Sequence, residues 1–235
     1  MTALRVTDLS VTYGPVVAVR DLSLTIEPGE ALVLLGPNGA GKTSAVEAIA
    51  GLLPKRRGKV EFFGQDISGL SASSVVRKGL ALVPQWRELF RTFSVEETLV
   101  AAMTAAEGRD ATPLESIYDL FPVLRERSQQ LAGSLSGGEQ QMLAIGRALV
   151  TNPKLILFDE PSAGLASGIT RTLIQSINRI RETGVAILLV EQNMEIARAV
   201  GERCCMLAAG NLAWEGSMKE ATERNEAVRV YFGLH

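Results

Sequence analysis

A glycine-rich stretch near the N-terminus has the residue types and the spacing that hold phosphate groups. It lies between an apolar run at 31–35 and a helical pattern at 43–50, so strand, loop and helix follow one another. Glycines let backbone N–H groups approach phosphate oxygens, and the start of the helix adds a partial positive charge. Lys42 would reach the β- and γ-phosphates, and the Thr43 hydroxyl would bind Mg²⁺. The residues expected to bind a nucleoside triphosphate are Gly36, Pro37, Asn38, Gly39, Ala40, Gly41, Lys42, Thr43 and Ser44.

Two adjacent carboxylates end a second apolar run. Asp159 and Glu160 follow the predicted strand at 154–158. In this position Asp159 can hold Mg²⁺, directly or through water, and Glu160 can polarise an attacking water. Taken alone, two acids at a strand end could simply face solvent. Beside a phosphate-binding loop, the interpretation as metal ligand and general base is favoured.

A second candidate anion site opens a helix. Ser136, Gly137, Gly138 and Glu139 combine a hydroxyl, two glycines and the positive end of the helix. A capping box between Ser136 and Glu139 is expected locally, but it does not explain two glycines, which destabilise a first turn. Two phosphate sites in one chain suggest that the second serves the nucleotide of another subunit.

Two further residues are weaker candidates. Gln85 follows a predicted buried strand and could contact a γ-phosphate or Mg²⁺, although a surface glutamine is the ordinary alternative. Tyr13 follows a predicted strand N-terminal to the loop and could stack on adenine. A partly buried strand tyrosine explains that position equally well.

Short apolar runs predict buried strands. Several are followed by helical patterns, as is typical of a parallel sheet in an α/β protein. Two other runs, at 4–13 and 22–26, alternate and predict half-buried antiparallel strands. The runs that predict buried strands are 31–35, 81–84, 154–158 and 185–190, with a further short strand at 58–64.

Between 86 and 150 the pattern changes from strands to helices. No clear strand interrupts this stretch, so we expect a helical subdomain at 86–150 inserted into an α/β core formed by 1–85 and 151–235. A capping box at Ser94 opens its first helix, and Pro122 breaks the second. The remaining predicted elements are helices at 114–127, 137–150, 169–182 and 193–200, and a hairpin at 203–214 turning at Gly210–Asn211.

Composition excludes several classes of protein. The chain has 235 residues, of which 46% are hydrophobic and 21% charged, as in an ordinary globular protein. A net charge of −2 gives no basis for nucleic-acid binding. The only cysteines, Cys204 and Cys205, are adjacent, which favours a reducing compartment. No apolar run approaches the roughly 18 residues of a membrane span, and no signal peptide is evident. We expect a cytosolic protein unless a partner holds it at a membrane.

Three motifs in this order resemble those of ABC transporter ATPases. Residues 36–43, 135–139 and 155–160 are similar to the Walker A, signature and Walker B motifs, and the resemblance covers essentially the whole chain. It implies a single ABC ATPase domain over 1–235: a RecA-like P-loop NTPase core, an N-terminal antiparallel β-subdomain and an inserted helical subdomain. It also implies a head-to-tail dimer that holds two ATP molecules with Mg²⁺. Tyr13 then matches the adenine-stacking aromatic residue, and Gln85 the Q-loop glutamine, a further Mg²⁺ ligand.

Two positions depart from the common family pattern. The family usually has a histidine at the position of Gln192, where it contacts the γ-phosphate; the one histidine of this chain is His235. Glutamine can donate a hydrogen bond to phosphate, but its side chain does not take up a proton and has no charge at neutral pH. Glu160 is present, so the site retains a candidate base. Many family members also have an aspartate at the position of Ala166.

A narrower resemblance is to the ATPases of branched-chain amino acid importers, in particular the shorter of the two in that system. It implies two membrane permeases, a sibling ATPase, an external solute-binding protein, and a peripheral position on the cytoplasmic face of the inner membrane. Gln85 is also what urea and short-amide importers carry. The segments that carry this resemblance are 190–193, 142–147 and Tyr231–Phe232–Gly233, with a looser fit at 83–85 and 90–97.

Other functions share parts of this pattern. An exporter ATPase would have every one of these catalytic residues, and the subgroup resemblance alone speaks against it. A soluble cassette of DNA repair or translation usually has a second cassette or a large insertion, and this chain has neither. Trp86, Phe90 and Phe93, with Arg87 and Arg91 between them, could form a surface for a permease or could anchor the helical insert on the core.

Overall fold

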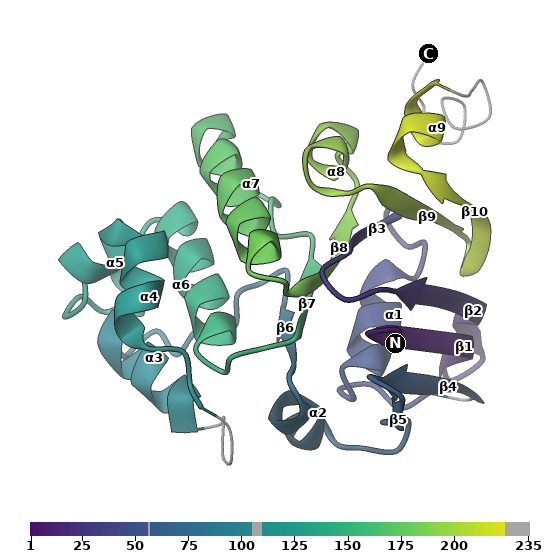
Figure 1. Ribbon diagram of the computed structural model, residues 1–235, viewed down its shortest axis with the longest axis horizontal. Helices are drawn as coiled ribbons and strands as arrows, with labels where there is room; N and C mark the ends of the chain where they lie inside the picture. The colour runs from purple at the N-terminus through teal and green to yellow at the C-terminus, as the bar shows by residue number, and fades with distance from the viewer. Residues whose placement is uncertain (56, 105–109, 224–235) are drawn as a thin grey trace.

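Two β-sheets and a group of helices make up the part of the chain that the computed structural model describes, residues 1–55, 57–104 and 110–223 (Figure 1). The candidate site residues follow the ends of strands in these sheets, and most helices between 95 and 149 lie to one side of the larger sheet. Tyr231–Phe232–Gly233 and His235, which entered the sequence argument, lie outside the described residues.

The smaller sheet is antiparallel, with strand order β2-β1-β4-β5. Its first strand matches the predicted 4–13, whereas β2 begins at Val16, so the prediction of a strand over 22–26 was too short. Residues 16–20 pair with β1 across the tight turn at Gly14, although several of them are partly exposed and give no clean alternation. The strands are β1 (Leu4–Tyr13), β2 (Val16–Ile26), β4 (Arg57–Phe62) and β5 (Gln65–Asp66).

The larger sheet has the order β10-β9-β3-β8-β7-β6. Five of its strands run parallel, and β10 pairs antiparallel with β9 at the edge. The predicted buried strands are confirmed to within one residue at each end. The strands are β3 (Ala31–Leu35), β6 (Leu80–Val83), β7 (Leu155–Asp159), β8 (Ala186–Glu191), β9 (Arg203–Ala208) and β10 (Asn211–Ser217).

The parallel sheet separates two apolar cores. In β3, Val33 and Leu35 face the core that contains the helices of the 95–149 region, while Leu32 and Leu34 face the core shared with the antiparallel sheet. All five residues of β3 are buried, because each face of the sheet is covered. The sheet is therefore a rigid base from which the strand ends project.

Helices outside the 95–149 region flank the parallel sheet or connect the two sheets. α2 was not predicted, since its serine-rich sequence gives little apolar periodicity. The hairpin of β9 and β10 turns at Ala209 and Gly210, both with positive φ, because Asn211 already pairs with Ala208. The predicted turn at Gly210–Asn211 was thus one residue too late. These helices are α1 (Lys42–Ile49), α2 (Ala72–Lys78), α7 (Ser167–Glu182), α8 (Met194–Val200) and α9 (Met218–Glu223).

The helical region follows its capping and proline signals. Ser94 and Glu97 exchange backbone–side-chain hydrogen bonds of 3.1 and 2.7 Å, as predicted for a capping box. Pro122 starts a new helix after a break at Phe121. The helices are α3 (Val95–Thr104), α4 (Leu114–Leu120), α5 (Pro122–Glu126) and α6 (Gly137–Leu149), with a 3₁₀ turn η1 (Ala132–Ser134).

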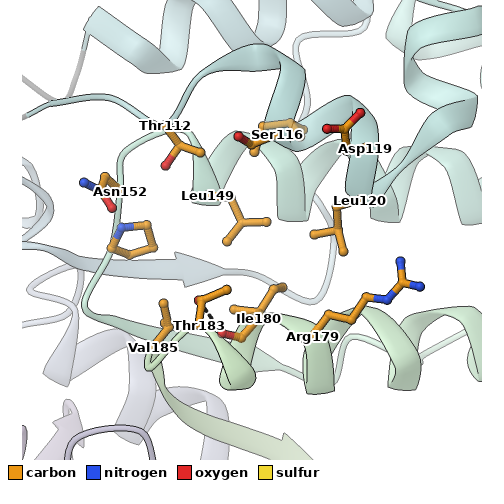
Figure 2. A pocket seen from close by; sticks show the side chains of 12 residues that line it. Thr112, Ser116, Asp119, Leu120, Leu149, Asn152, Arg179, Ile180, Thr183 and Val185 are labelled. Carbon is orange, nitrogen blue, oxygen red and sulfur yellow. Dashed lines mark hydrogen bonds between the residues drawn. The ribbon is translucent and has the colours of Figure 1, made fainter.

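A cleft of about 490 Å³ separates α4 from the C-terminal half of α7 (Figure 2). Apolar side chains line it from both sides, Leu120 and Leu149 facing Ile180 and Val185, together with polar side chains such as Ser116 and Thr183. The helical region is therefore not tightly packed against α7 at this end.

None of the described helices is long and apolar enough to cross a membrane. Burial raises the pKa of both Cys204 and Cys205, on β9, to about 12.

Candidate functional site

The glycine-rich loop leaves β3 and enters α1 with the shape that its glycines permit. Gly41, the N-cap of α1, has φ 100°, and a Cβ there would lie 2.2 Å from the carbonyl oxygen of Ala18. Lys42 is buried, and its Nζ donates hydrogen bonds of 2.8 and 3.0 Å to the carbonyl oxygens of Gly36 and Pro37. The ammonium group thus lies inside the loop, where an anion held by the backbone N–H groups would meet it.

The last hairpin supports this loop. Ala40 accepts a 3.1 Å hydrogen bond from the N–H of Gly210, in the β9–β10 turn. A Cβ at Gly36 would lie 2.6 Å from the carbonyl oxygen of Leu207 on β9, so a side chain there would force the two segments apart. The β9–β10 hairpin therefore helps to fix the position of the loop.

Asp159, at the end of β7, lies beside the first turn of α1. Thr43 Oγ1 donates a 3.2 Å hydrogen bond to Asp159 Oδ1. Asp159 is 3% exposed, and burial, aided by the neighbouring Glu160, raises its pKa to about 6 despite the hydrogen bond from Thr43. A hydroxyl and a carboxylate at this spacing are the hard oxygen donors that Mg²⁺ binds. A divalent cation would also compensate the buried charge, so these residues fit the metal.

Glu160 is the point where four loops meet. Its Oε1 lies 3.1 Å from Lys42 Nζ and accepts a 2.6 Å hydrogen bond from Gln192 Nε2, while its Oε2 accepts a 3.3 Å bond from Gln85 Nε2. Gln192 Nε2 also lies 2.7 Å from Asn38 Oδ1. The backbone of Glu160 has φ 44°, a strained conformation for a residue with a side chain. The exits of β3, β6, β7 and β8 thus converge on one carboxylate.

Tyr13 lies at the rim of the loop. Its hydroxyl is 3.4 Å from Ser44 Oγ, and 48% of the residue is exposed. The ring therefore presents a face to solvent next to the start of α1, where a flat apolar group could stack.

The signature residues are arranged differently. Ser136 and Glu139 form the predicted capping box, with hydrogen bonds of 2.8 and 3.4 Å. Ser136 and Gly137 are exposed, whereas Gly138 is buried against Ile169 of α7. Across the described ranges, no hydrogen bond or ion pair joins these residues to the phosphate loop of the same chain. The structure thus brings the glycine-rich loop and the start of α1 together with Tyr13, Gln85, Asp159, Glu160 and Gln192. The turn at Ser136 and Gly137, where α6 begins, makes no hydrogen bond or ion pair with this group in the part of the chain that the structure describes.

Sequence reasoning missed several contacts. Glu191 is 2% exposed, its pKa is raised by burial, and its carboxylate accepts a 3.3 Å hydrogen bond from the N–H of Gln192. It therefore fixes the backbone of the residue that reaches Glu160. Arg147 and Gln141, on α6, hold the segment after Gln85. A glutamate at a strand end and two polar residues in a helix carry no sequence signal for such contacts.

The fold is that of an ATP-binding cassette, with an antiparallel subdomain beside a RecA-like sheet. The family model for ABC transporters matches residues 19–163, and this chain belongs to that family. The ADP conformation of MJ1267, an ATP-binding cassette of an ABC transporter, matches it with a TM-score of 0.83 and 26% identity over 99% of both chains.

Two curated relatives are similar over most of their length. The high-affinity branched-chain amino acid transport ATP-binding protein BraG of Pseudomonas aeruginosa is 40% identical over 205 residues, 87% of this chain and 88% of BraG. The lipopolysaccharide export system ATP-binding protein LptB of Escherichia coli K12 is 33% identical over 237 residues, 99% of this chain and 98% of LptB. The chain is thus an ABC transporter ATPase: it binds ATP, and its ATP hydrolysis is coupled to transport. ATPases of this family dimerise and pair with permeases.

Proposed function

We propose that this chain is the ATPase of an importer for branched-chain or other hydrophobic amino acids. The observation that carries the proposal is its 40% identity to BraG, whose name states branched-chain amino acid transport. The alternative of a urea or short-amide importer rests on Gln85. LptB, named for lipopolysaccharide export, keeps an exporter open at 33% identity. A soluble cassette outside transport is the alternative of another class, and the permease experiment below tests it.

The residue roles in hydrolysis form the second part of the proposal. Lys42 and the loop N–H groups bind the β- and γ-phosphates, and the exposed ring of Tyr13 stacks on adenine. Thr43, Asp159 and Gln85 would hold Mg²⁺, which when bound neutralises charge on the phosphates. Glu160 accepts a proton from the attacking water as general base. Gln192 orients Glu160 and donates a hydrogen bond toward the γ-phosphate. The hydrogen bonds that converge on Glu160 support these roles.

A second ATPase completes the site in this proposal. Ser136, Gly137, Gly138 and Glu139 bind the nucleotide of the facing subunit, a second copy or a sibling ATPase, in a head-to-tail dimer. The exposure of Ser136 and Gly137, and their separation from the phosphate loop of their own chain, support this assignment. A helix start with free N–H groups is the kind of surface that an anion from another subunit would occupy.

The region 86–150 is proposed as the helical subdomain that meets two permeases at the cytoplasmic face of the inner membrane, with 1–85 and 151–235 as the α/β core. An external solute-binding protein would deliver substrate to those permeases. Trp86 is 80% exposed, Phe90 66% and Phe93 38%, and the rings of Phe90 and Phe93 lie 5.2 Å apart. Exposed aromatic rings grouped in this way support a contact surface for a partner.

The experiment is affinity purification of the chain from detergent-solubilised native membranes, followed by solute-uptake assays on the permeases recovered. Two permeases and a second ATPase, with ATP-dependent uptake of leucine, isoleucine or valine, are the expected result. Uptake of urea by the same permeases would favour the short-amide alternative. Recovery of only soluble partners would overturn the importer proposal.

A further inference from the structure

The segment that follows Gln85 has a strained backbone. Arg87 and Glu88 are consecutive non-glycine residues with φ of 63° and 46°. A positive φ at a residue with a side chain is strained and persists only where the surroundings impose it. The segment joins Gln85, which contacts Glu160, to the exposed aromatic residues. The strained turn therefore connects Glu160, the proposed general base, to the proposed partner surface. The contacts that hold the turn in place would affect both.

Two side chains of α6 hold the turn. Arg147 donates through Nη1 to the carbonyl oxygen of Glu88, at 2.6 Å, and through Nη2 to that of Arg87, at 2.9 Å. Gln141 Oε1 accepts a 3.0 Å hydrogen bond from Arg87 Nε. Residues 141 and 147 lie roughly 9 Å apart along the helix axis, so the turn is fixed at two levels of α6.

Within the described residues, the side-chain hydrogen bonds of Gln141 and Arg147 are all made with the turn. Arg147 is partly buried and makes no ion pair within the described ranges, so the two carbonyl oxygens are what satisfy its guanidinium. Gln141 is 2% exposed, and its Nε2 has no hydrogen-bond partner among the described atoms. A buried amide nitrogen without an acceptor is costly, whereas the oxygen of the same amide accepts a hydrogen bond from Arg87.

The other end of the segment is joined to the entrance of α6. Arg91 and Phe93 accept backbone hydrogen bonds of 3.0 and 2.8 Å from Gly133 and Ala132, which lead into Ser136. The guanidinium of Arg87 also lies against the first turn of α6, where a Cβ on Gly137 would be 3.7 Å from Arg87 Nη2. The start of the segment 86–93 is therefore attached to α6, and its end to the 3₁₀ turn η1 that leads into α6.

We propose that Arg147 and Gln141 are positioning residues that make the segment 86–93 and helix α6 move as one unit. A displacement of the exposed Trp86 and Phe90 then reorients Ser136 and Gly137. The inference about one moving unit rests on this chain alone. Its consequence for hydrolysis rests on the proposed dimer, in which Ser136 binds the nucleotide of the facing subunit.

The test measures amide hydrogen exchange in the full chain for Arg147→Lys and Gln141→Met. Lysine keeps the charge but cannot donate to two carbonyls in a fixed fork. Methionine fills the buried volume and removes the unpaired donor. In the nucleotide-free chain we expect exchange at 86–93 to rise about tenfold in Arg147→Lys and severalfold in Gln141→Met, with folding retained. Arg125→Lys, an exposed arginine of α5, is the matched control and leaves this exchange unchanged. A purely structural role predicts that Gln141→Met slows exchange or leaves it unchanged, and unaltered exchange at 86–93 in both variants would overturn the proposal.

A second arm adds ATP in a Glu160→Gln background. In the parent, both 86–93 and 136–141 gain protection as the signature turn closes on the second subunit. In Arg147→Lys, 136–141 still gains protection and 86–93 does not; protection of both segments would count against the link. If 136–141 gains no protection even in the parent, the head-to-tail dimer is wrong, and the nucleotide-free comparison still decides the role of Arg147.

Discussion

Gln192 donates a 2.6 Å hydrogen bond to Glu160, a residue 32 positions earlier in the chain. The same amide nitrogen lies 2.7 Å from Asn38 Oδ1, in the glycine-rich loop. One neutral side chain thus spans the exits of three parallel strands, β3, β7 and β8, at the position where the family resemblance implies a histidine. The amide helps to orient Glu160 and adds no titratable group at this position, since glutamine does not ionise at neutral pH.

Replacing Glu160 by glutamine should abolish turnover while keeping nucleotide binding. The amide is isosteric but cannot accept a proton, and general-base catalysis contributes about 100-fold or more. ATPase assays should show at least that loss, and calorimetry should show an ATP affinity within severalfold of the parent. Glu182→Gln, on the surface of α7, is the control. Substantial hydrolysis by the Glu160→Gln chain would refute its role as base.

Gln192 is expected to tolerate histidine better than alanine. Histidine retains a hydrogen-bond donor at the same place, so Gln192→His should hydrolyse ATP at the parental rate or faster. Gln192→Ala removes the donor to a carboxylate, a bond worth roughly 1.5–3 kcal/mol, and should lower kcat about tenfold or more. Steady-state kinetics on both variants decide the matter. Equal rates for the alanine variant and the parent would show that this contact does not serve hydrolysis.

Asp159 makes the stability of the nucleotide-free chain depend on pH. Its pKa rises from 3.8 to about 6 on folding, so the folded state binds more protons between these values. Stability should therefore fall as pH rises from about 4 to about 6, by on the order of 3 kcal/mol at most. Asp159→Asn removes this change, and urea unfolding at pH 4 and pH 7 measures it. The exposed Asp119→Asn is the control, and an Asp159→Asn chain with the parental pH dependence would contradict the assignment.

The exposed aromatic residues Trp86 and Phe90 should affect the binding of permeases and not the binding of ATP. In the double variant Trp86→Ala and Phe90→Ala we expect loss of permease co-purification with ATP binding unchanged, because neither ring touches the phosphate loop within the described residues. Leu52→Ala removes a comparably exposed apolar side chain, 57% accessible, elsewhere on the surface. Retention of permeases by the double variant, or their loss in the control, would locate the contact elsewhere.

Strands buried on both faces were predictable because their composition alone distinguishes them. The apolar runs of β3 (five residues) and β7 (four, Leu155 to Phe158) and the break at Pro122 follow directly from burial and proline geometry. The start of β2 and helix α2 did not, since their side chains are largely exposed or partly exposed and give no clear apolar periodicity. Turn register at Ala209 likewise depends on which residues pair in the finished hairpin.

In the candidate site too, some features could be predicted from the sequence and others could not. Residues at strand ends, such as Asp159 and Glu160, can be grouped from sequence because parallel strands end at one edge of a sheet. Contacts between long side chains cannot. The bonds of Gln192 to Asn38 and of Arg147 to Glu88 join positions 154 and 59 residues apart, and rotamers decide them.

The two buried thiols on β9 make the chain convenient for spectroscopic labelling. A thiol with a pKa of about 12 has almost no thiolate at neutral pH, and thiolate is the form that reacts with maleimides. Single cysteines introduced at exposed positions can therefore be labelled without removing Cys204 or Cys205. A donor and an acceptor dye on the helical region and on the antiparallel sheet would then report their separation during each round of ATP hydrolysis.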